Sequence, residues 1–160
     1  TLFMGCEFGQ WKEWDFNAPL DWALMNAPLH AGLVNLIRDL NRNYSSHPGW
    51  AKCDHQSDKF SWVDCNDRDR QTLSFLRLGE EASETLLVAC NFSGRLVHRD
   101  WGCPHPGGWK VLLDTDSPHY GGEGSAGGTV FSSLANPCDG HPQSLSFSVG
   151  RWSVRILCPG

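Results

Sequence analysis

After about residue 50 the sequence consists of short apolar or alternating runs separated by turn residues. This pattern constrains the fold more than any other feature of the sequence. Runs of this length, with no helical period between them, favour antiparallel strands over strands joined by crossover helices. The predicted strands cover residues 60–64, 72–78, 85–92, 109–113, 129–131, 144–149 and 152–157. Short strands at this spacing are typical of an antiparallel β-sandwich.

The first fifty residues follow a different pattern. Residues 1–4 are an apolar run that predicts a short buried strand, and residues 7–26 lack any period, which predicts a long loop. From Pro28 apolar side chains recur at spacings of three and four, which predicts a helix that ends soon after Asn43. A strand, a loop and a helix are the repeating unit of a (β/α)8 barrel, but one such unit cannot close a core.

We therefore expect two parts in a chain that is mainly β. Residues 1–47 are predicted to be one strand, a long loop and one helix of an incomplete (β/α)8 barrel. Residues 48–160 are predicted to form an antiparallel β-sandwich as an all-β C-terminal domain. Because the chain starts without Met on an apolar run, we expect it to be part of a longer protein.

Composition argues against several classes of function. With 13 Lys and Arg against 18 Asp and Glu, the net charge of -5 opposes binding to nucleic acid and to anionic membranes. No apolar run reaches the roughly 18 residues that a membrane-spanning helix needs. The seven cysteines lack the spacing of a disulfide scaffold, so we expect reduced thiols and a cytoplasmic protein. Since the Cys–His couples have no matching second half, we expect neither a metal nor another cofactor.

The long loop carries the residues that could serve chemistry. A glycosidase needs two carboxylates on either side of the scissile bond, and the loop offers Glu7, Glu13, Asp15 and Asp21. The ordinary alternative is that these acids hydrogen-bond backbone amides of the loop. The sequence marks none of them as a nucleophile.

Tryptophan beside acids or amides is a usual way to hold a sugar, because the ring stacks on the apolar face of the sugar while the polar groups take its hydroxyls. Trp11 and Trp14, beside Gln10, fit that description, and the alternative is that they pack the loop onto its scaffold. Three other tryptophans lie in strand patterns and are expected in the core: Trp62, Trp109 and Trp152.

Most of the chain resembles one known family. The stretches that carry the resemblance are 2–10 (LFMGCEFGQ), 13–14 (EW), 20–22 (LDW), 38–42 (RDLNR), 60–64 (FSWVD), 107–109 (GGW) and 114–116 (DTD). In order and spacing they are similar to the last barrel strand, the following loop and helix, and the C-terminal domain of bacterial 1,4-α-glucan (glycogen) branching enzymes of the α-amylase superfamily. Cys6, Asp114 and the stretch 121–128 depart from the usual wording of that family.

The resemblance implies a retaining transfer, in which α-1,4-glucan chains are cleaved and joined to a 6-hydroxyl as α-1,6 branches of glycogen. In that family the nucleophile and the acid/base follow earlier barrel strands, so we expect them upstream of Thr1 and expect the chain alone to be inactive. The implied partners are an α-glucan (glycogen or amylose) and the missing N-terminal part of the barrel. The residues implied to line the glucan groove are Glu7, Gln10, Trp11, Trp14 and Trp22.

Two other readings remain open at this point. The chain could be a non-catalytic module, in which the β-sandwich binds glucan or serves as a scaffold. It could also belong to a related hydrolase of the α-amylase superfamily.

Overall fold

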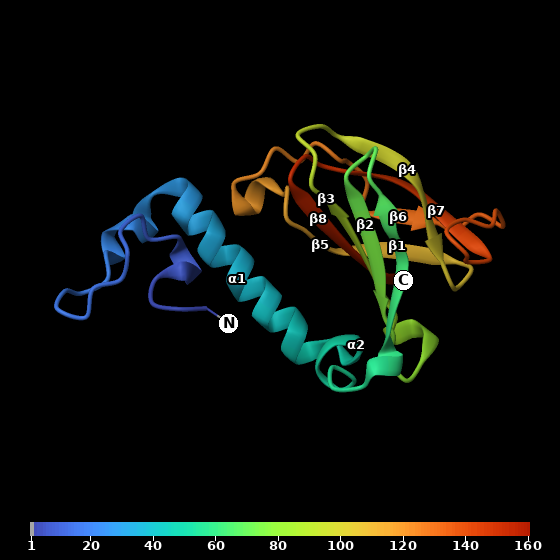
Figure 1. Ribbon diagram of the computed structural model, residues 1–160, viewed down its shortest axis with the longest axis horizontal. Coiled ribbons are helices and arrows are strands. Elements are labelled where there is room, and N and C mark those ends of the chain that lie inside the picture. The colour runs from blue at the N-terminus through green and yellow to red at the C-terminus, as the bar shows by residue number, and fades with distance from the viewer. Residues whose placement is uncertain (1) are drawn as a thin grey trace.

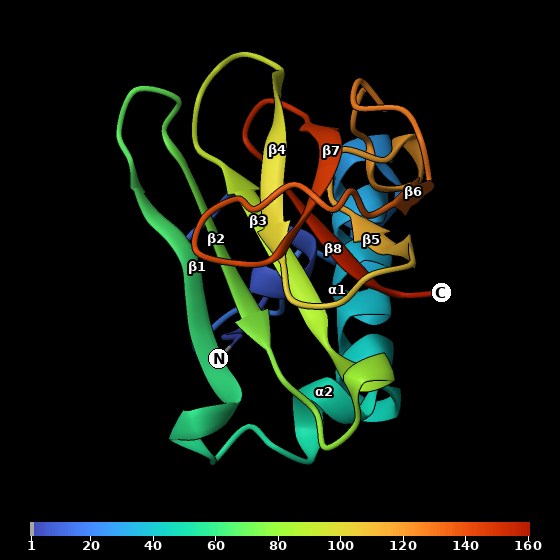
Figure 2. The ribbon, with the colours of Figure 1, turned by 90° about the vertical axis from the view of Figure 1, so that its right-hand side faces the viewer.

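The computed structural model describes residues 2–160 and has three layers: a long helix, a six-stranded sheet and a two-stranded sheet (Figures 1 and 2). The helices are α1 (Pro28–Ser46) and the short α2 (Pro48–Ala51). The strands are β1 (Phe60–Asp67), β2 (Thr72–Arg77), β3 (Leu86–Asn91), β4 (Val97–Cys103), β5 (Gly108–Asp114), β6 (Val130–Ser132), β7 (Gln143–Val149) and β8 (Ser153–Pro159). Single turns of 3-10 helix include η1 (Cys6–Phe8), η2 (Trp22–Asn26), η3 (Ser57–Lys59), η4 (Ala82–Glu84) and η5 (Pro118–Tyr120).

All strand pairs are antiparallel. The large sheet has the order β1-β2-β3-β8-β5-β6, and β4 pairs with β7 in the small sheet. The strand β3 is buried along its whole length, as expected for a central strand that is covered on both faces. The mainly β, antiparallel architecture predicted from the sequence is confirmed.

The space between the two sheets holds the inner core. It contains Leu76, Leu87, Ala89, Trp101, Cys103, Trp109, Leu145, Phe147, Val149 and Leu157. The rings of Trp101 and Phe147 stack with centroids 5.4 Å apart. The indole N–H of Trp101 donates to the carbonyl oxygen of Phe147 at 3.1 Å, and that of Trp109 donates to His105 at 3.2 Å. Both buried indoles therefore keep their hydrogen bonds, which removes most of the cost of burying them.

The opposite face of the large sheet is also apolar, and α1 covers part of it. Leu36 and Leu40 of α1, with Trp50 of α2, pack against a second cluster formed by Leu86, Val88, Cys90, Leu113, Ile156 and Cys158. A polar contact fixes the helix at a second point, because the hydroxyl of Tyr120 donates to the carboxylate of Asp39 at 3.0 Å. The helix thus belongs structurally to the sandwich that follows it, and Figure 1 shows the N-terminal segment on the far side of α1 from the sheet.

A buried arginine ties the glycine-rich loop to the large sheet. The guanidinium of Arg155 pairs with the carboxylate of Asp114 at 2.7 Å. Its other N–H groups donate to the carbonyl oxygens of Ser148, Gly127 and Gly128, so the charge is both paired and hydrogen-bonded. The stretch 121–128 is a loop, as the sequence predicts, and this arginine holds its end.

The strand and helix predictions were mostly confirmed, with a few differences. The helix was predicted to end soon after Asn43, extends to Ser46 and is followed by α2, which begins at Pro48. The strand β4 was not predicted, because its middle residues are polar: Arg99 pairs with Asp64 and Asp67 at 2.9 Å and with Asp139 at 2.7 Å. A buried ion-pair network of this kind is invisible to hydrophobic patterning.

The strand predicted at residues 1–4 was wrong for the part that can be judged. Thr1 lies outside the described residues, and residues 2–4 enter a turn in which Leu2, Phe3 and Met4 are exposed. An apolar run becomes a strand only where a neighbouring strand takes its backbone hydrogen bonds. Within residues 2–160 no strand pairs with this segment.

A glycine in α1 tests the contact between the helix and the sandwich. We expect Gly32→Ala to lower the free energy of unfolding by about 1–3 kcal/mol, because the new Cβ would overlap the carbonyl group of Tyr120. The better helix propensity of alanine, up to about 1 kcal/mol, offsets only part of this loss. Unfolding in guanidinium chloride, followed by tryptophan fluorescence, measures the difference. Gly108→Ala is the matched control, since its Cβ meets nothing within 4 Å. Equal unfolding midpoints for the two variants would contradict the packing described.

Candidate functional site

The long loop is held on α1 by one buried side chain and one hydrogen bond. Gly5 and Gly9 have φ values of 92° and 66°, which glycine adopts readily, and they bring the chain into and out of η1. Phe8 between them is fully buried. Its carbonyl oxygen lies 2.7 Å from Nδ1 of His30, which projects from the first turn of α1. These contacts fix the position of the loop relative to α1.

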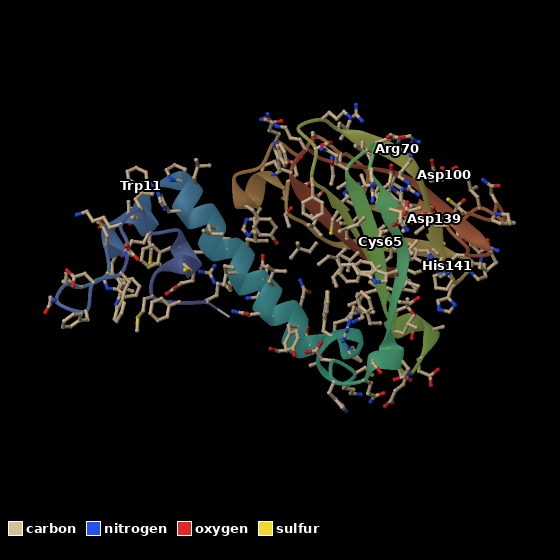
Figure 3. All side chains as sticks on the ribbon, viewed as in Figure 1. Trp11, Cys65, Arg70, Asp100, Asp139 and His141 are labelled. Atoms are coloured by element: carbon tan, nitrogen blue, oxygen red, sulfur yellow. The ribbon has the colours of Figure 1, made fainter. Side chains whose placement is uncertain are left out.

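The three loop tryptophans each rest on one neighbouring ring and leave much of their surface open. Trp11 is 81% exposed and lies 5.4 Å from the ring of His30, at the N-terminal end of α1 and far from Asp139 and His141 of the sandwich (Figure 3). Trp14 contacts the ring of Phe3 edge to face at 5.2 Å, and Trp22 lies 5.3 Å from the ring of Phe8. None of the three is a core residue.

The polar residues predicted for the site are engaged with the loop backbone. The carboxylate of Glu7 accepts the N–H of Gly5 at 3.1 Å. The amide of Gln10 uses both ends, since its oxygen accepts the N–H of Asp21 at 2.9 Å and its nitrogen donates to the carbonyl of Lys12 at 3.0 Å. Gln10 thereby links its own position in the loop to Asp21, eleven residues further along the chain. In this chain Glu7 and Gln10 shape the loop.

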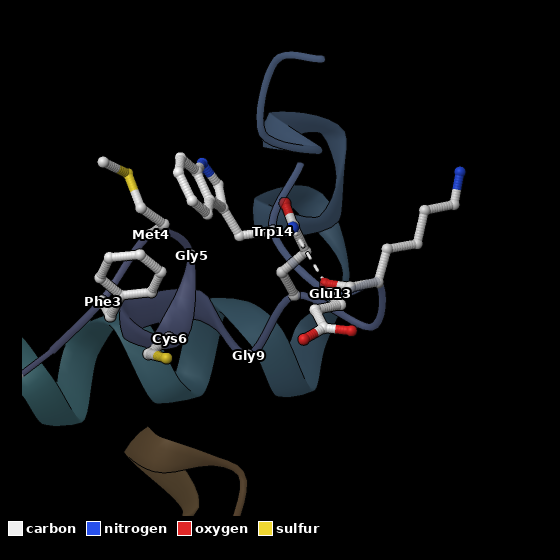
Figure 4. A pocket seen from close by; sticks show the side chains of 9 residues that line it. Phe3, Met4, Gly5, Cys6, Gly9, Glu13 and Trp14 are labelled. Atoms are coloured by element: carbon white, nitrogen blue, oxygen red, sulfur yellow. Dashed lines mark hydrogen bonds between the residues drawn. The ribbon is translucent and has the colours of Figure 1, made fainter. Parts of the chain in front are cut away.

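Three hollows lie at or beside the loop, and some of the residues predicted for the site line them. The first, of about 470 Å3, is lined by Phe3, Met4, Gly5, Cys6, Gly9, Gln10, Lys12, Glu13 and Trp14, and Figure 4 shows the ring of Trp14 beside Met4 and Phe3. The second, of about 570 Å3, lies between Gln10 and Asp21. Glu7 faces a third hollow beside Val34 and Ile37 of α1. The structure thus brings Gln10 and Trp14 together, and Trp11 and Trp22 line none of these three hollows.

The expectation that Trp62 and Trp152 lie in the core was wrong, whereas Trp109 is fully buried as predicted. Trp62 is 52% exposed on β1, the edge strand of the large sheet. Its ring contacts Phe60 and Phe75 edge to face, with centroids 5.0 and 6.0 Å apart. We call Phe60, Trp62 and Phe75 the β1 aromatic platform. The only sequence signal for it was the spacing of Phe60 and Trp62, which places both on one face of the strand.

The buried cysteines Cys90 and Cys103 are unsuited to nucleophilic chemistry. Burial raises the pKa of Cys90 to about 11, and burial together with nearby Cys138 raises that of Cys103 to about 11. Such thiols remain protonated and unreactive near neutral pH. No disulfide joins any of the seven cysteines, and residues 2–160 contain no group of three His, Cys, Asp or Glu side chains placed to hold a metal ion. Among the same residues no helix is long and apolar enough to cross a membrane.

Comparisons with known proteins cover nearly the whole chain. Residues 62–160 match the α-amylase C-terminal all-beta domain. The 1,4-alpha-glucan branching enzyme GlgB of Rhodospirillum rubrum is 40% identical over 159 residues, which are 99% of this chain and 21% of that protein. The corresponding enzyme of Bordetella bronchiseptica is 42% identical over 158 residues, again 21% of its length. The chain therefore spans about a fifth of the length of the curated relatives it matches.

A solved structure shows the same fold at low sequence identity. The crystal structure of CldA, described as a cyclomaltodextrin glucanotransferase with a three-domain ABC distribution, is 14% identical and has a TM-score of 0.54. The match covers 97% of this chain and 28% of that one. At this identity the likeness concerns the fold alone.

The anchor formed by His30 can be tested through the exposure of the loop to protease. We expect His30→Ala to speed tryptic cleavage after Lys12 by about tenfold, because loss of a buried hydrogen bond lowers the local opening free energy by about 1–1.5 kcal/mol. The rate is measured by mass spectrometry of the released fragments under native conditions. His55→Ala, at an exposed position outside the loop, is the control and should leave the rate unchanged. Equal rates for both variants would contradict the role of His30.

Proposed function

Since the chain belongs to the family of the α-amylase C-terminal all-beta domain, we propose that it is the C-terminal part of a 1,4-α-glucan branching enzyme. Such an enzyme cleaves α-1,4-glucan chains and transfers them to a 6-hydroxyl, which forms the α-1,6 branches of glycogen in the cytoplasm. The observation that carries the proposal is the extent of the similarity. The 40% identity to the Rhodospirillum rubrum enzyme runs over 159 residues and so includes the loop and α1, which the domain match does not cover.

We divide the chain into residues 1–47, the end of the catalytic barrel, and residues 48–160, the C-terminal domain. Exposed apolar side chains support the first part of this division. Leu2 and Met4 line a hollow with Val34 and Ile37 of α1, on the side of the helix that does not pack against the sheet. An apolar surface of this kind needs a cover, and the proposal assigns it to the N-terminal part of the barrel.

The reaction that we propose for the whole enzyme has two steps. An Asp of the barrel attacks the anomeric carbon of an α-1,4 linkage while a Glu protonates the leaving oxygen, which gives a glucanyl–enzyme ester. The 6-hydroxyl of a second chain then attacks that carbon, gives its proton to the Glu and displaces the Asp. We carry over neither acid to this chain and place both upstream of Thr1.

The loop residues take supporting roles in this proposal. Trp11, Trp14 and Trp22 offer open ring surface for stacking against glucose units, and Glu7 and Gln10 hold the loop in shape beside the groove. The exposure of Trp11 and Trp22, 81% and 56%, supports this assignment, because a tryptophan that serves only packing buries most of its surface.

A second function is favoured by the β1 aromatic platform. Trp62 lies on an edge strand, half exposed and braced by Phe60 and Phe75, which is a suitable surface for the apolar face of a sugar. The sandwich would then hold a glucan chain while the barrel acts on it. This function is compatible with the first and also applies to a non-catalytic glucan-binding module.

The chain alone is expected to show no branching activity, because the proposal places the nucleophile and the acid/base outside it. Incubation with amylose, followed by iodine absorbance, measures branching. We expect constant absorbance over hours, with a longer chain that includes the upstream reading frame as the positive control. A sustained fall in absorbance with new α-1,6 linkages would contradict the placement of the acids. A fall with new reducing ends would instead favour the hydrolase reading.

Substitution of Trp62 tests glucan binding by the platform. We expect Trp62→Ala to weaken retention in glycogen-containing native gels by about fivefold in apparent dissociation constant, since one stacking contact contributes about 1 kcal/mol. Val130→Ala removes apolar surface at another exposed strand position and should change nothing. If the platform serves only packing, Trp62→Ala and the unsubstituted chain migrate alike in glycogen.

A further inference from the structure

The connection between the two helices depends on one histidine side chain. His47 ends α1, where its backbone N–H donates to the carbonyl oxygen of Asn43 at 2.9 Å, and it is also the N-cap of α2. Its ring nitrogen Nδ1 accepts the N–H of Gly49 at 3.2 Å. Because Nδ1 is the acceptor, this bond requires a neutral ring that carries its proton on Nε2. We call His47 and α2 together the α1–α2 joint.

The helix α2 has few other contacts that could replace this cap. It contains only four residues, so it lacks the run of internal hydrogen bonds that stabilises a longer helix. Trp50 of α2 packs on the apolar cluster on the α1 side of the large sheet. A hollow of about 230 Å3, which Tyr44 and Ile156 also line, lies beside Trp50. Because the packing around Trp50 is incomplete, we expect local opening of α2 to cost little.

Burial and nearby charges determine the protonation of His47. Burial of the ring lowers the pKa of His47, Glu84 of η4 opposes this effect, and Lys110 of β5 adds to it. Lys52, which follows α2, lies near enough to Glu84 to help lower the pKa of that carboxyl. Gly49 packs between these groups, since a Cβ at this position would be 2.2 Å from the carbonyl oxygen of Glu84. The folded protein therefore favours the neutral ring that the cap requires.

The lowered pKa of His47 gives the direction of the pH dependence. Above its ordinary value of 6.5 the ring is neutral in the folded and the unfolded chain, and the cap is fully present. As the pH falls below 6.5 the unfolded chain takes up the proton first, so acid destabilises the joint. A protonated Nδ1 would also present an N–H to the N–H of Gly49, and two donors cannot form a hydrogen bond.

We propose that the α1–α2 joint is a proton-sensitive switch within the chain. In the neutral form His47 caps α2 and keeps Trp50 on the sheet. In the protonated form the ring releases Gly49, turns toward the carboxylate of Glu84 and lets α2 open. Acid thereby uncovers part of the sheet beside the last turn of α1, at the boundary after residue 47 in the proposed division of the chain. This inference does not depend on the proposed activity, because it concerns only contacts within the chain.

Amide hydrogen exchange on the full chain, followed by NMR, tests the switch. We expect the protection factor of the Gly49 amide to fall by about fivefold between pH 7.5 and pH 5, since a helix cap changes the opening equilibrium by about that factor. In His47→Asn the protection factor should stay constant, because asparagine is a strong N-cap and does not titrate. His55→Asn, at an exposed position, is the matched control and should keep the fall. A local readout is needed because burial also lowers the pKa of His141. A constant protection factor in the unsubstituted chain, or the same fall in His47→Asn, would overturn the proposal.

A second measurement needs no change at His47. Labelling with 5-fluorotryptophan gives a fluorine resonance for Trp50, which is assigned by its loss in Trp50→Phe. In the unsubstituted chain we expect this resonance to shift with pH at the same midpoint as the ring C–H signal of His47. The resonances of buried Trp101 and Trp109 are internal controls and should stay unchanged over this range. A Trp50 resonance that stays constant between pH 7.5 and pH 5, or that shifts at a different midpoint, would contradict the switch.

Discussion

The large sheet is apolar on both faces, and the rest of the structure follows from the need to cover them. The two-stranded sheet of β4 and β7 covers one face and closes the inner core around Trp101 and Trp109. The other face receives Leu36 and Leu40 of α1. A sheet in which β3 is buried along its whole length cannot stand without both covers. The helix that the sequence assigned to the end of a barrel therefore also completes the sandwich.

Sequence patterns were sufficient where a residue's environment follows from its immediate neighbours. The long helix and the strands with clear alternation were found in this way, and the resemblance to branching enzymes was confirmed over nearly the whole chain. The strand β4 was missed, because Arg99 is balanced by three aspartates from distant segments. The run at residues 2–4 was misread for the opposite reason: its composition suits a strand, but no partner strand lies beside it.

The candidate site shows the same limit more sharply. The sequence could indicate that Gln10 and Trp14 belong to one loop, but only the structure shows that Gln10 bonds Asp21 and that Trp14 rests on Phe3. Whether a tryptophan in a strand is buried depends on which strand forms the edge of the sheet. The spacing of neighbouring residues in the sequence does not indicate the order of the strands. Trp109 and Trp62 both read as core residues, yet one lies in the centre of the sandwich and the other on its border.

The helix α1 has a mechanical consequence for the loop it carries. Its 19 residues make a rigid rod of about 28 Å, clamped to the sheet by Leu36, Leu40 and the bond from Tyr120 to Asp39. The loop is attached near the N-terminal end of this helix, where His30 holds Phe8. His30 lies ten residues, or about 15 Å, from Leu40, so a tilt of about 5° in how the sandwich packs on the helix would move the attachment point by about 1 Å. A change in how the β-sandwich packs against α1 would therefore also shift the tryptophans of the loop.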